Sequence, residues 1–414
     1  MAVIYFVLLV APQVLLFRYL WVRLPDPEHP AWARLVRLAL MLVFAAFDFP
    51  WIFVARRVLL GSVWSGGSIP MLAPWLAWQL LGWMFGALVS MYILVKAGVW
   101  TLRKLRGAWG VVRDGAGRKP ALERQVPLPT PHSPLSRRRF LARATYGYAA
   151  TGLALTGYGI ASARSVPGVT RRVLTFPDLP PAFDGLTILH ISDVHAGTYM
   201  ERDRMQEVVA RANAQRADLV LQTGDMIDYS PSYIPEYVAA FRELHAPLGV
   251  ITCLGNHDLY TGAAKVIKGV RDAGQIVVRG ETHLIDRNGS TLAIAGIDDP
   301  DNWVFDDPQT LAVDRVLEGL PSDAFTILLA HRPGAFDTAR QRGVPLTLSG
   351  HIHGGQIAIP LVGWSAGQLI TKYVAGHFAS AQSQLYVSRG IGVVGVPIRV
   401  FVPPELALFE LRRG

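Results

Sequence analysis

The stretch Val250-Ile-Thr-Cys-Leu-Gly-Asn-His-Asp258 joins a short apolar run directly to a cluster of polar side chains. The apolar part has the length of a buried strand, and Gly255 ends it. The Asn-His-Asp triplet follows at the carboxyl end of this strand, where layered α/β proteins commonly bind their ligands. The single cysteine, Cys253, lies inside the apolar run, so we interpret it as a buried core residue.

Four more apolar runs end in residue types that bind metal ions. They are residues 188–192 before Asp193 and His195, 219–223 before Asp225 and Asp228, 325–330 before His331, and 346–349 before His351 and His353. Asp-x-His and His-x-His place two side chains on one side of an extended segment, because side-chain direction repeats every second residue. Five such elements in one chain favour a metal centre over a purely structural role.

The chemistry of these residue types narrows the choice of metal. Carboxylate, imidazole and amide ligands without thiolate suit Mn, Fe or Zn better than Ca, and they do not choose among the three. Two divalent ions about 3.5–4 Å apart need a bridging carboxylate and several neutral imidazoles. We therefore expect two divalent metal ions where the strand ends converge.

From about residue 170 onward, short apolar runs alternate with helical patterns, which predicts an α/β layered domain. The expected strands are 186–191, 218–223, 249–254, 291–297, 325–330, 346–349 and 406–411. The expected helices are about 201–216, 234–244, 261–273, 308–318 and 334–342.

The motif set Asp-x-His, Gly-Asp-x-x-Asp, Gly-Asn-His-Asp, His and Gly-His-x-His resembles the calcineurin-like metallophosphoesterase superfamily over about residues 170–412. Residues 350–356, 386–391 and 397–404 resemble its bacterial membrane-associated branch, which includes twin-arginine-exported phosphodiesterases and a pyrophosphatase of lipid A synthesis. The resemblance implies a four-layer αββα sandwich, with two sheets inside and helices outside. It also implies hydrolysis of phosphomonoester or phosphodiester bonds.

Individual roles follow from the same resemblance. One metal ion is expected on Asp193, His195 and His353. The other is expected on Asn256, His331 and His351, with Asp225 bridging the two.

The resemblance also implies how the proton is handled. His257 is expected to face the phosphate as general acid or transition-state donor, and Asp258 is expected to orient it. The family pattern leaves Asp228 open, and an N-terminal cap of the following segment is at least as good an interpretation as a catalytic role.

Other polar residues have structural interpretations. His190 is expected to be a buried, hydrogen-bonded side chain. Arg389 and Arg399 fit structural ion pairs better than phosphate contacts. The acidic residues at 298–301 and 306–307 are interpreted as a solvated turn and helix cap and not as a calcium site.

The net charge of +9 is unevenly distributed along the chain. Residues 1–163 carry 18 Lys and Arg against 5 Asp and Glu, a net charge of +13. Residues 164–414 carry 22 against 26, a net charge of −4. The basic excess therefore belongs to the N-terminal part, and the high isoelectric point does not indicate a nucleic-acid partner.

The N-terminal part predicts a membrane region, in a chain that is 51% apolar and only 17% charged. Residues 1–100 contain three apolar stretches, which approach the roughly 20 residues of a membrane-spanning helix: 1–17, about 38–55 and about 71–95. Residues 101–143 form a basic cytoplasmic linker. The weaker apolar segment 144–163 is either a fourth span or a signal-like segment.

Basic residues between the stretches predict the orientation. The third connection, residues 96–143, carries twelve Lys and Arg against two in the second, so it is expected in the cytoplasm. The fourth segment then places residues 164–414 outside, in a multi-pass protein of a bacterial inner membrane. Ser136-Arg-Arg-Arg-Phe-Leu141 fits a twin-arginine export motif and an ordinary basic flank equally well.

Three classes of function compete. The leading one is a phosphoesterase acting on a soluble or a membrane-associated, lipid-linked phosphoester; an enzyme like UDP-2,3-diacylglucosamine pyrophosphatase is the alternative within it. A non-catalytic metal-binding scaffold would have no need of the proton donor His257. A transporter is disfavoured, because the apolar stretches contain few charges other than Asp48.

Overall fold

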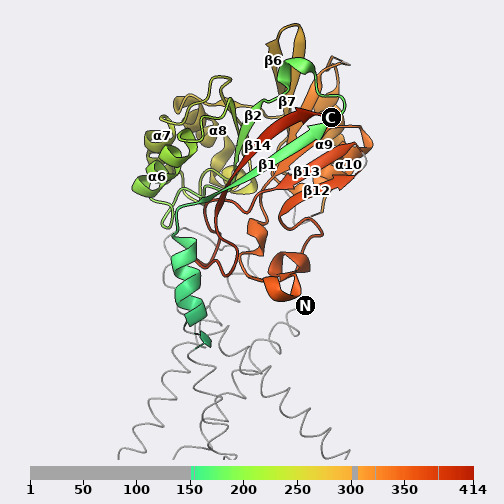
Figure 1. Ribbon diagram of the computed structural model, residues 1–414. Coiled ribbons are helices and arrows are strands. Elements are labelled where there is room, and N and C mark those ends of the chain that lie inside the picture. The colour runs from blue at the N-terminus through green and yellow to red at the C-terminus, as the bar shows by residue number, and fades with distance from the viewer. Residues whose placement is uncertain (1–150, 153, 301–305, 322, 381) are drawn as a thin grey trace, which may run out of the picture. The chain divides into compact units, whose positions relative to one another are not determined.

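The computed structural model describes residues 151–414, apart from 153, 301–305, 322 and 381. Two six-stranded sheets lie at its centre, and helices cover their outer faces (Figure 1). The strand order is β1-β14-β2-β3-β4-β5 in the first sheet and β12-β13-β9-β8-β7-β6 in the second. Both sheets mix parallel and antiparallel neighbours, and the predicted α/β domain is confirmed.

The strands of the first sheet are β1 (Gly168–Phe176), β2 (Thr187–Ile191), β3 (Leu219–Thr223), β4 (Val250–Cys253), β5 (Ile276–Val277) and β14 (Glu405–Arg413). Those of the second are β6 (Glu281–Arg287), β7 (Ser290–Gly296), β8 (Phe325–Leu329), β9 (Leu346–Ser349), β12 (Gly376–Ser380) and β13 (Ser383–Val387). A short hairpin pairs β10 (Ala358–Ile359) with β11 (Trp364–Ser365).

The α-helices are α6 (Arg202–Asn213), α7 (Ile234–Phe241), α8 (Asn256–Asp272), α9 (Thr310–Leu317) and α10 (Phe336–Gln341). The 3-10 helices are η1 (Pro181–Phe183), η2 (Pro231–Tyr233), η3 (Pro333–Ala335), η4 (His353–Gly355), η5 (Pro360–Val362) and η6 (Ala366–Leu369).

Apolar clusters on both sides of each sheet produce the layers. Between the sheets, Ile188 and Leu221 of the first pack in one cluster with Ile294 and Ile327 of the second. Separate clusters join the first sheet to α6, α7 and α8, and the second sheet to α9 and α10. Because β3 and β8 are buried along their whole length, their sequences are apolar runs without alternation.

The last strand lies inside the first sheet. β14 pairs in parallel with β1, from Gly168 opposite Glu405 to Phe176 opposite Arg413, and in antiparallel with β2 (Figure 1). The two ends of the domain thus form neighbouring strands.

The helix expected from about residue 261 begins earlier, at Asn256. The Asp258 carboxylate accepts a hydrogen bond from the Gly255 backbone N–H at 2.9 Å, which stabilises the first turn. The motif Gly-Asn-His-Asp is therefore the beginning of a helix, and a kink at Gly262 (φ 111°) follows it.

The strands that the sequence pattern missed are mostly at sheet edges. β1, β5, β6 and β12 are edge strands, and only two positions of β1 are buried. An edge strand contacts one neighbour and little core, so its apolar pattern is weak.

The three expected spans and the basic linker lie outside the described residues. Of the expected fourth segment, residues 154–163 are helical. No helix among the described residues is long and apolar enough to cross a bilayer.

Candidate metal centre

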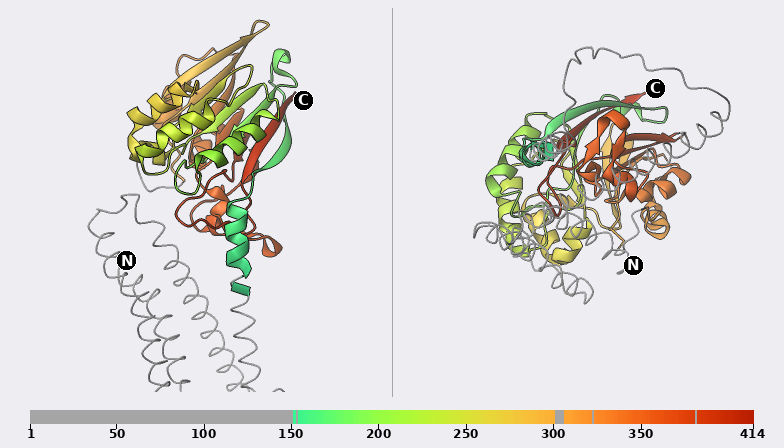
Figure 2. Two further views of the ribbon diagram at one scale, coloured as in Figure 1. Left: turned by 90° about the vertical axis from the view of Figure 1, so that its left-hand side faces the viewer. Right: turned by 90° about the horizontal axis from the view of Figure 1, so that it is seen from below.

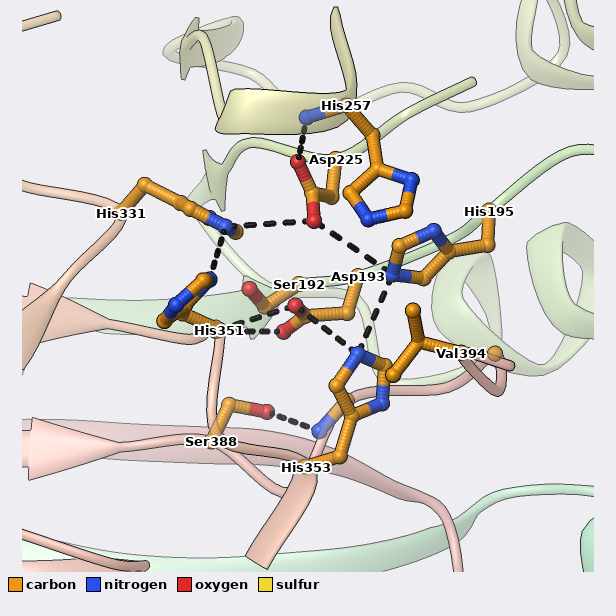
Figure 3. Close-up of polar contacts among 12 residues, drawn as sticks. Ser192, Asp193, His195, Asp225, His257, His331, His351, His353, Ser388 and Val394 are labelled. Atoms are coloured by element: carbon orange, nitrogen blue, oxygen red, sulfur yellow. Dashed lines mark hydrogen bonds and ion pairs between the residues drawn. The ribbon is translucent and has the colours of Figure 1, made fainter. Parts of the chain in front are cut away.

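The five polar clusters converge at the carboxyl ends of the central strands of the two sheets (Figure 3). Asp193 and His195 follow β2, Asp225 follows β3, and Asn256 and His257 open α8 directly after β4. From the second sheet, His331 follows β8, and His351 and His353 follow β9. Each strand supplies a rigid support, so loops far apart in the sequence meet at one place.

A first group of donors contains Asp193, His195 and His353, all buried. The His353 Nε2 atom lies 3.3 Å from Asp193 Oδ1 and 3.1 Å from His195 Nε2. A second group contains His331, His351 and Asp225. The His351 Nδ1 and Asn256 Oδ1 atoms each lie 3.1 Å from His331 Nε2.

Asp225 belongs to both sides of the site. Its Oδ2 atom lies 3.4 Å from His195 Nε2 and 3.2 Å from His331 Nε2. Its Oδ1 atom accepts a hydrogen bond from the His257 backbone N–H at 2.8 Å. One carboxylate thus faces the two donor groups at once, and the donor atoms fit divalent cations of the borderline type.

The backbone at this site is unusual. Asp193, His195, Asp225, His351 and His353 all have positive φ angles, between 48° and 70°. Non-glycine residues rarely adopt this region, at a cost of about 1–3 kcal/mol each. Five such residues in one site indicate that the surrounding fold holds the loops in the positions that aim these side chains.

Two glycines allow the strand ends to approach each other. Gly224 has φ +87°, and a Cβ atom there would collide with the backbone of Gly255. A Cβ atom on Gly350 would collide with the side chains of Ser192 and Asp193. Any larger residue at either position would push the donor loops apart.

The tautomer of His331 is fixed by a backbone carbonyl. Its Nδ1 atom lies 2.6 Å from the Thr223 carbonyl oxygen, which can only accept, so Nδ1 donates the hydrogen bond. In the neutral ring, the lone pair is then on Nε2, the nitrogen that lies beside Asp225 and Asn256. A carbonyl partner of this kind typically orients a metal-binding histidine.

His257 is oriented by Asp228 and not by Asp258. The His257 Nδ1 atom lies 3.0 Å from Asp228 Oδ1, whereas the Asp258 carboxylate accepts from the backbone N–H groups of Met226, Ile227 and Gly255. The expected orienting role of Asp258 is therefore wrong. Its position at the start of α8 directs it to the loop after β3 instead.

The alternative of Asp228 as a helix cap is also wrong, because the Ser230 side chain caps the following 3-10 helix. Asp228 also lies 3.6 Å from His195 Nδ1, so it contacts two histidines of the site. The Gly-Asp-x-x-Asp motif already indicated that Asp228 lies near the site, since it places Asp228 three residues after Asp225.

The remaining polar residues have structural roles. His190 is buried, its Nε2 atom lies 2.9 Å from Thr223 Oγ1, and burial lowers its pKa to about 3. Arg389 forms the expected ion pair, with Glu405. Arg399 is fully buried and has no ion-pair partner among the described residues. Its guanidinium donates to the carbonyl groups of four residues, which include Gly392 and Val402, and its Nη2 atom lies 3.2 Å from His353 Nδ1.

The acidic turn at 298–299 was expected to be solvated, but it is partly buried. Asp299 is buried and accepts two hydrogen bonds from the buried Arg332, at 2.7 and 2.9 Å. Arg332 directly follows His331, so this ion pair supports the loop that carries a donor. Cys253 is buried, as expected.

The carboxylates control the proton on His331 in the metal-free protein. Burial lowers its pKa, but Asp225, Asp193 and Asp299 raise it more, to about 10. Burial alone would raise the pKa of Asp225, but His331 and His257 lower it well below its usual range. Below about pH 10, His331 therefore carries a second ring proton, on Nε2, and a bound cation must displace this proton.

We expect Mn²⁺ binding to the metal-free protein at pH 7 to release at least about one proton, because His331 must become neutral to act as a ligand. The apparent affinity should rise up to about tenfold per pH unit below the pKa of His331. Calorimetry in buffers of different ionisation enthalpy measures this release. His331→Ala should release fewer protons and His190→Asn the same number as the wild type; binding without proton release would contradict the prediction.

A cavity of about 290 Å³ opens over the donors. Its lining combines the polar side chains of Asp225, His257, His351, His353 and Gln356 with small or apolar residues. A two-sheet α/β fold with convergent carboxylates and imidazoles below such a cavity defines a metal-dependent hydrolase site.

Comparison with known proteins gives the family. Residues 186–355 match the family model described as calcineurin-like phosphoesterase. The chain is 32% identical over 291 residues to the metallophosphoesterase YkuE of Bacillus subtilis, which covers 67% of this chain and 98% of that protein. The chain belongs to the calcineurin-like metallophosphoesterase family and is a phosphoester hydrolase.

Two further relatives are similar over comparable lengths. The phosphodiesterase YaeI of Escherichia coli is 29% identical over 289 residues, covering 67% of this chain and 99% of that protein. A bovine transmembrane protein with a metallophosphoesterase domain is 32% identical over 269 residues, covering 62% of this chain and 60% of that protein.

Proposed function

We propose that the domain at residues 170–412 hydrolyses phosphomonoester or phosphodiester bonds with two divalent metal ions. The observation that carries this proposal is the Asp225 carboxylate, which faces both donor groups within 3.4 Å. Asp193, His195 and His353 would hold one ion, and Asn256, His331 and His351 the other. Ions at such a site lower the pKa of a water molecule and offset the charge of the phosphoryl group.

His257 supplies the proton in this proposal. Asp228 accepts from its Nδ1 atom, which leaves Nε2 as the ring nitrogen available to a substrate. His257 lines the cavity beside the donors, so it can donate to the leaving oxygen as that oxygen gains charge. Asp228 holds the ring in place.

The proposed function is tested with the purified full chain loaded with Mn, Fe or Zn. Phosphomonoester, phosphodiester and pyrophosphate substrates, soluble and lipid-linked, are compared with each metal. We expect metal-dependent turnover of at least one phosphomonoester or phosphodiester, and its loss in Asp225→Ala. Full metal occupancy without turnover of any substrate would favour the non-catalytic scaffold.

We also propose that the chain is a multi-pass protein of a bacterial inner membrane, with residues 1–100 forming three spans and 101–143 a cytoplasmic linker. The support is the charge difference between the second and third connections. Residues 144–163 then deliver the catalytic domain to the outer side.

A reporter that is active only outside the cytoplasm, fused after Gly414, is expected to give a signal. If export uses the twin-arginine route, changing Arg137 and Arg138 to Lys abolishes that signal; a basic flank retains it. Activity of a cytoplasmic reporter at the same position would reverse the orientation and favour an enzyme acting on a cytoplasmic lipid precursor.

A further inference from the structure

Exposed apolar side chains gather beside the mouth of the cavity. They belong to residues 154–163, to the segment around β10 and η6, and to residues 398–401. We call this surface the apolar rim, and its main members are Tyr158, Leu361, Val362, Leu369, Ile370 and Phe401.

The exposure of the rim is extreme for apolar side chains. Leu361 is 97% exposed, Leu369 76% and Val362 72%. The sequence from 354 to 371 contains no charged residue at all. Soluble proteins keep such continuous apolar surfaces small, so a surface of this kind indicates a binding partner.

The three segments of the rim are connected by direct contacts. The Tyr158 and Phe401 rings are 5.3 Å apart, and the Arg399 backbone N–H donates to the Gly159 carbonyl at 2.9 Å. Val400 in turn bridges to Ile357, next to the β10–β11 hairpin. In both Figure 1 and Figure 2, the helix at 154–163 and the hairpin lie at the same end of the domain.

The chain that precedes the rim indicates what covers it. Residues 154–163 are the second half of the weaker apolar segment 144–163. This segment follows the basic linker and the three apolar stretches with the composition of membrane spans. The helix at 154–163 therefore connects that part of the chain to the rim itself, through Tyr158. A lipid surface is the partner that this sequence brings to the same end of the domain.

The cavity continues the apolar character of the rim. Besides His257 and His353, the residues that line it include Ala366, Ile370 and Val394. Ile370 belongs to both the cavity and the rim, and Leu369 lies next to it. An amphiphilic molecule fits this arrangement, with its phosphate at the donors and its apolar part along the wall.

We propose that the apolar rim docks on a lipid bilayer and that the cavity takes a phosphoester carried by a membrane lipid. The substrate assignment rests on the proposed phosphoesterase function, whereas the docking does not. The hairpin tip at Leu361 and Val362 enters the interface between headgroups and acyl chains. A lipid headgroup can then reach the donors without leaving the membrane.

Docking is tested by fluorescence quenching in the full chain, reconstituted into vesicles of phosphatidylethanolamine and phosphatidylglycerol. Leu361→Cys is labelled with a fluorophore, and Cys253 stays unlabelled because it is buried. The matched control is Leu311→Cys, since Leu311 is also highly exposed (82%) but lies on α9. Nitroxide-labelled lipids should quench the label at 361 and leave the label at 311 bright.

Equal quenching at the two positions, or none at 361, would overturn the docking proposal. Loss of quenching on dilution of the protein in the membrane, with crosslinking between copies, would assign the rim to self-association. Neither outcome depends on whether the protein turns over any substrate.

The substrate class is tested with Leu361→Asp/Val362→Asp, compared with Leu311→Asp. The double variant should hydrolyse a soluble phosphodiester at the wild-type rate and a lipid phosphodiester in vesicles at least about tenfold more slowly. Equal rates of wild type and double variant on the lipid would overturn the lipid assignment. Failure of the wild type on every substrate would instead contradict the phosphoesterase function and leave the quenching result standing.

Discussion

Asp225→Ala is expected to remove bound metal from both positions and to lower kcat/KM for a phosphodiester by more than about 100-fold. Loss of a partner that merely orients a ligand typically costs 10–100-fold, and Asp225 faces both donor groups directly. His195→Ala removes a donor from one group only, so it should retain about half of the metal. Metal content after dialysis, measured by mass spectrometry, compares the two variants.

Asp272→Ala is the matched control, because this aspartate is exposed on α8 and pairs with Lys268 away from the site. It should keep full metal content and activity. Equal metal loss in Asp225→Ala and His195→Ala would contradict the bridging assignment.

His257→Ala is expected to lower kcat by about 10²–10⁴-fold while the metal content stays at the wild-type level. The reason is that the hydrogen bond to Asp228 uses Nδ1 of His257 and leaves Nε2 available to a substrate. The side chain also lines the cavity. Asp228→Asn should lie between this variant and the wild type, about 10–100-fold below the latter, because an amide still accepts the hydrogen bond but carries no charge.

Metal content decides between two roles of His257, since its side chain also lies within reach of His195 and Asp225. A clear loss of metal in His257→Ala would place this residue among the ligands. Asp258→Asn separates the two carboxylates: it should lower the melting temperature, because Asp258 holds three backbone N–H groups, and affect kcat less than Asp228→Asn.

The site was predictable because its residues stand at strand ends. Buried strands such as β3 and β8 are marked by continuous apolar runs, and the residue after each run must lie at the carboxyl end of its strand. The five clusters could therefore be located before their three-dimensional arrangement was known. Residue types then gave the chemistry, since Asp, His and Asn at these strand ends suit divalent cations.

Long-range partners could not be predicted in the same way. The contact of His257 with Asp228 joins the loops after two strands, and that of Asp299 with Arg332 joins residues 33 positions apart. The positive φ angles at residues such as His351 are imposed by tertiary packing and have no local signal. Edge strands such as β1 were missed because they bury little apolar surface.

The position of β14 has a consequence for the order of folding. Because β14 separates β1 from β2, these two strands cannot complete their pairing until residues 405–413 have been synthesised. Up to that moment β2 lacks one neighbour and β1 has none, so the nascent chain exposes unpaired strand edges. The contact between β1 and β14 closes a loop of more than 200 residues, which is entropically slow to form. Completion of the first sheet should therefore be a late step in folding, because β1 and β2 both await β14.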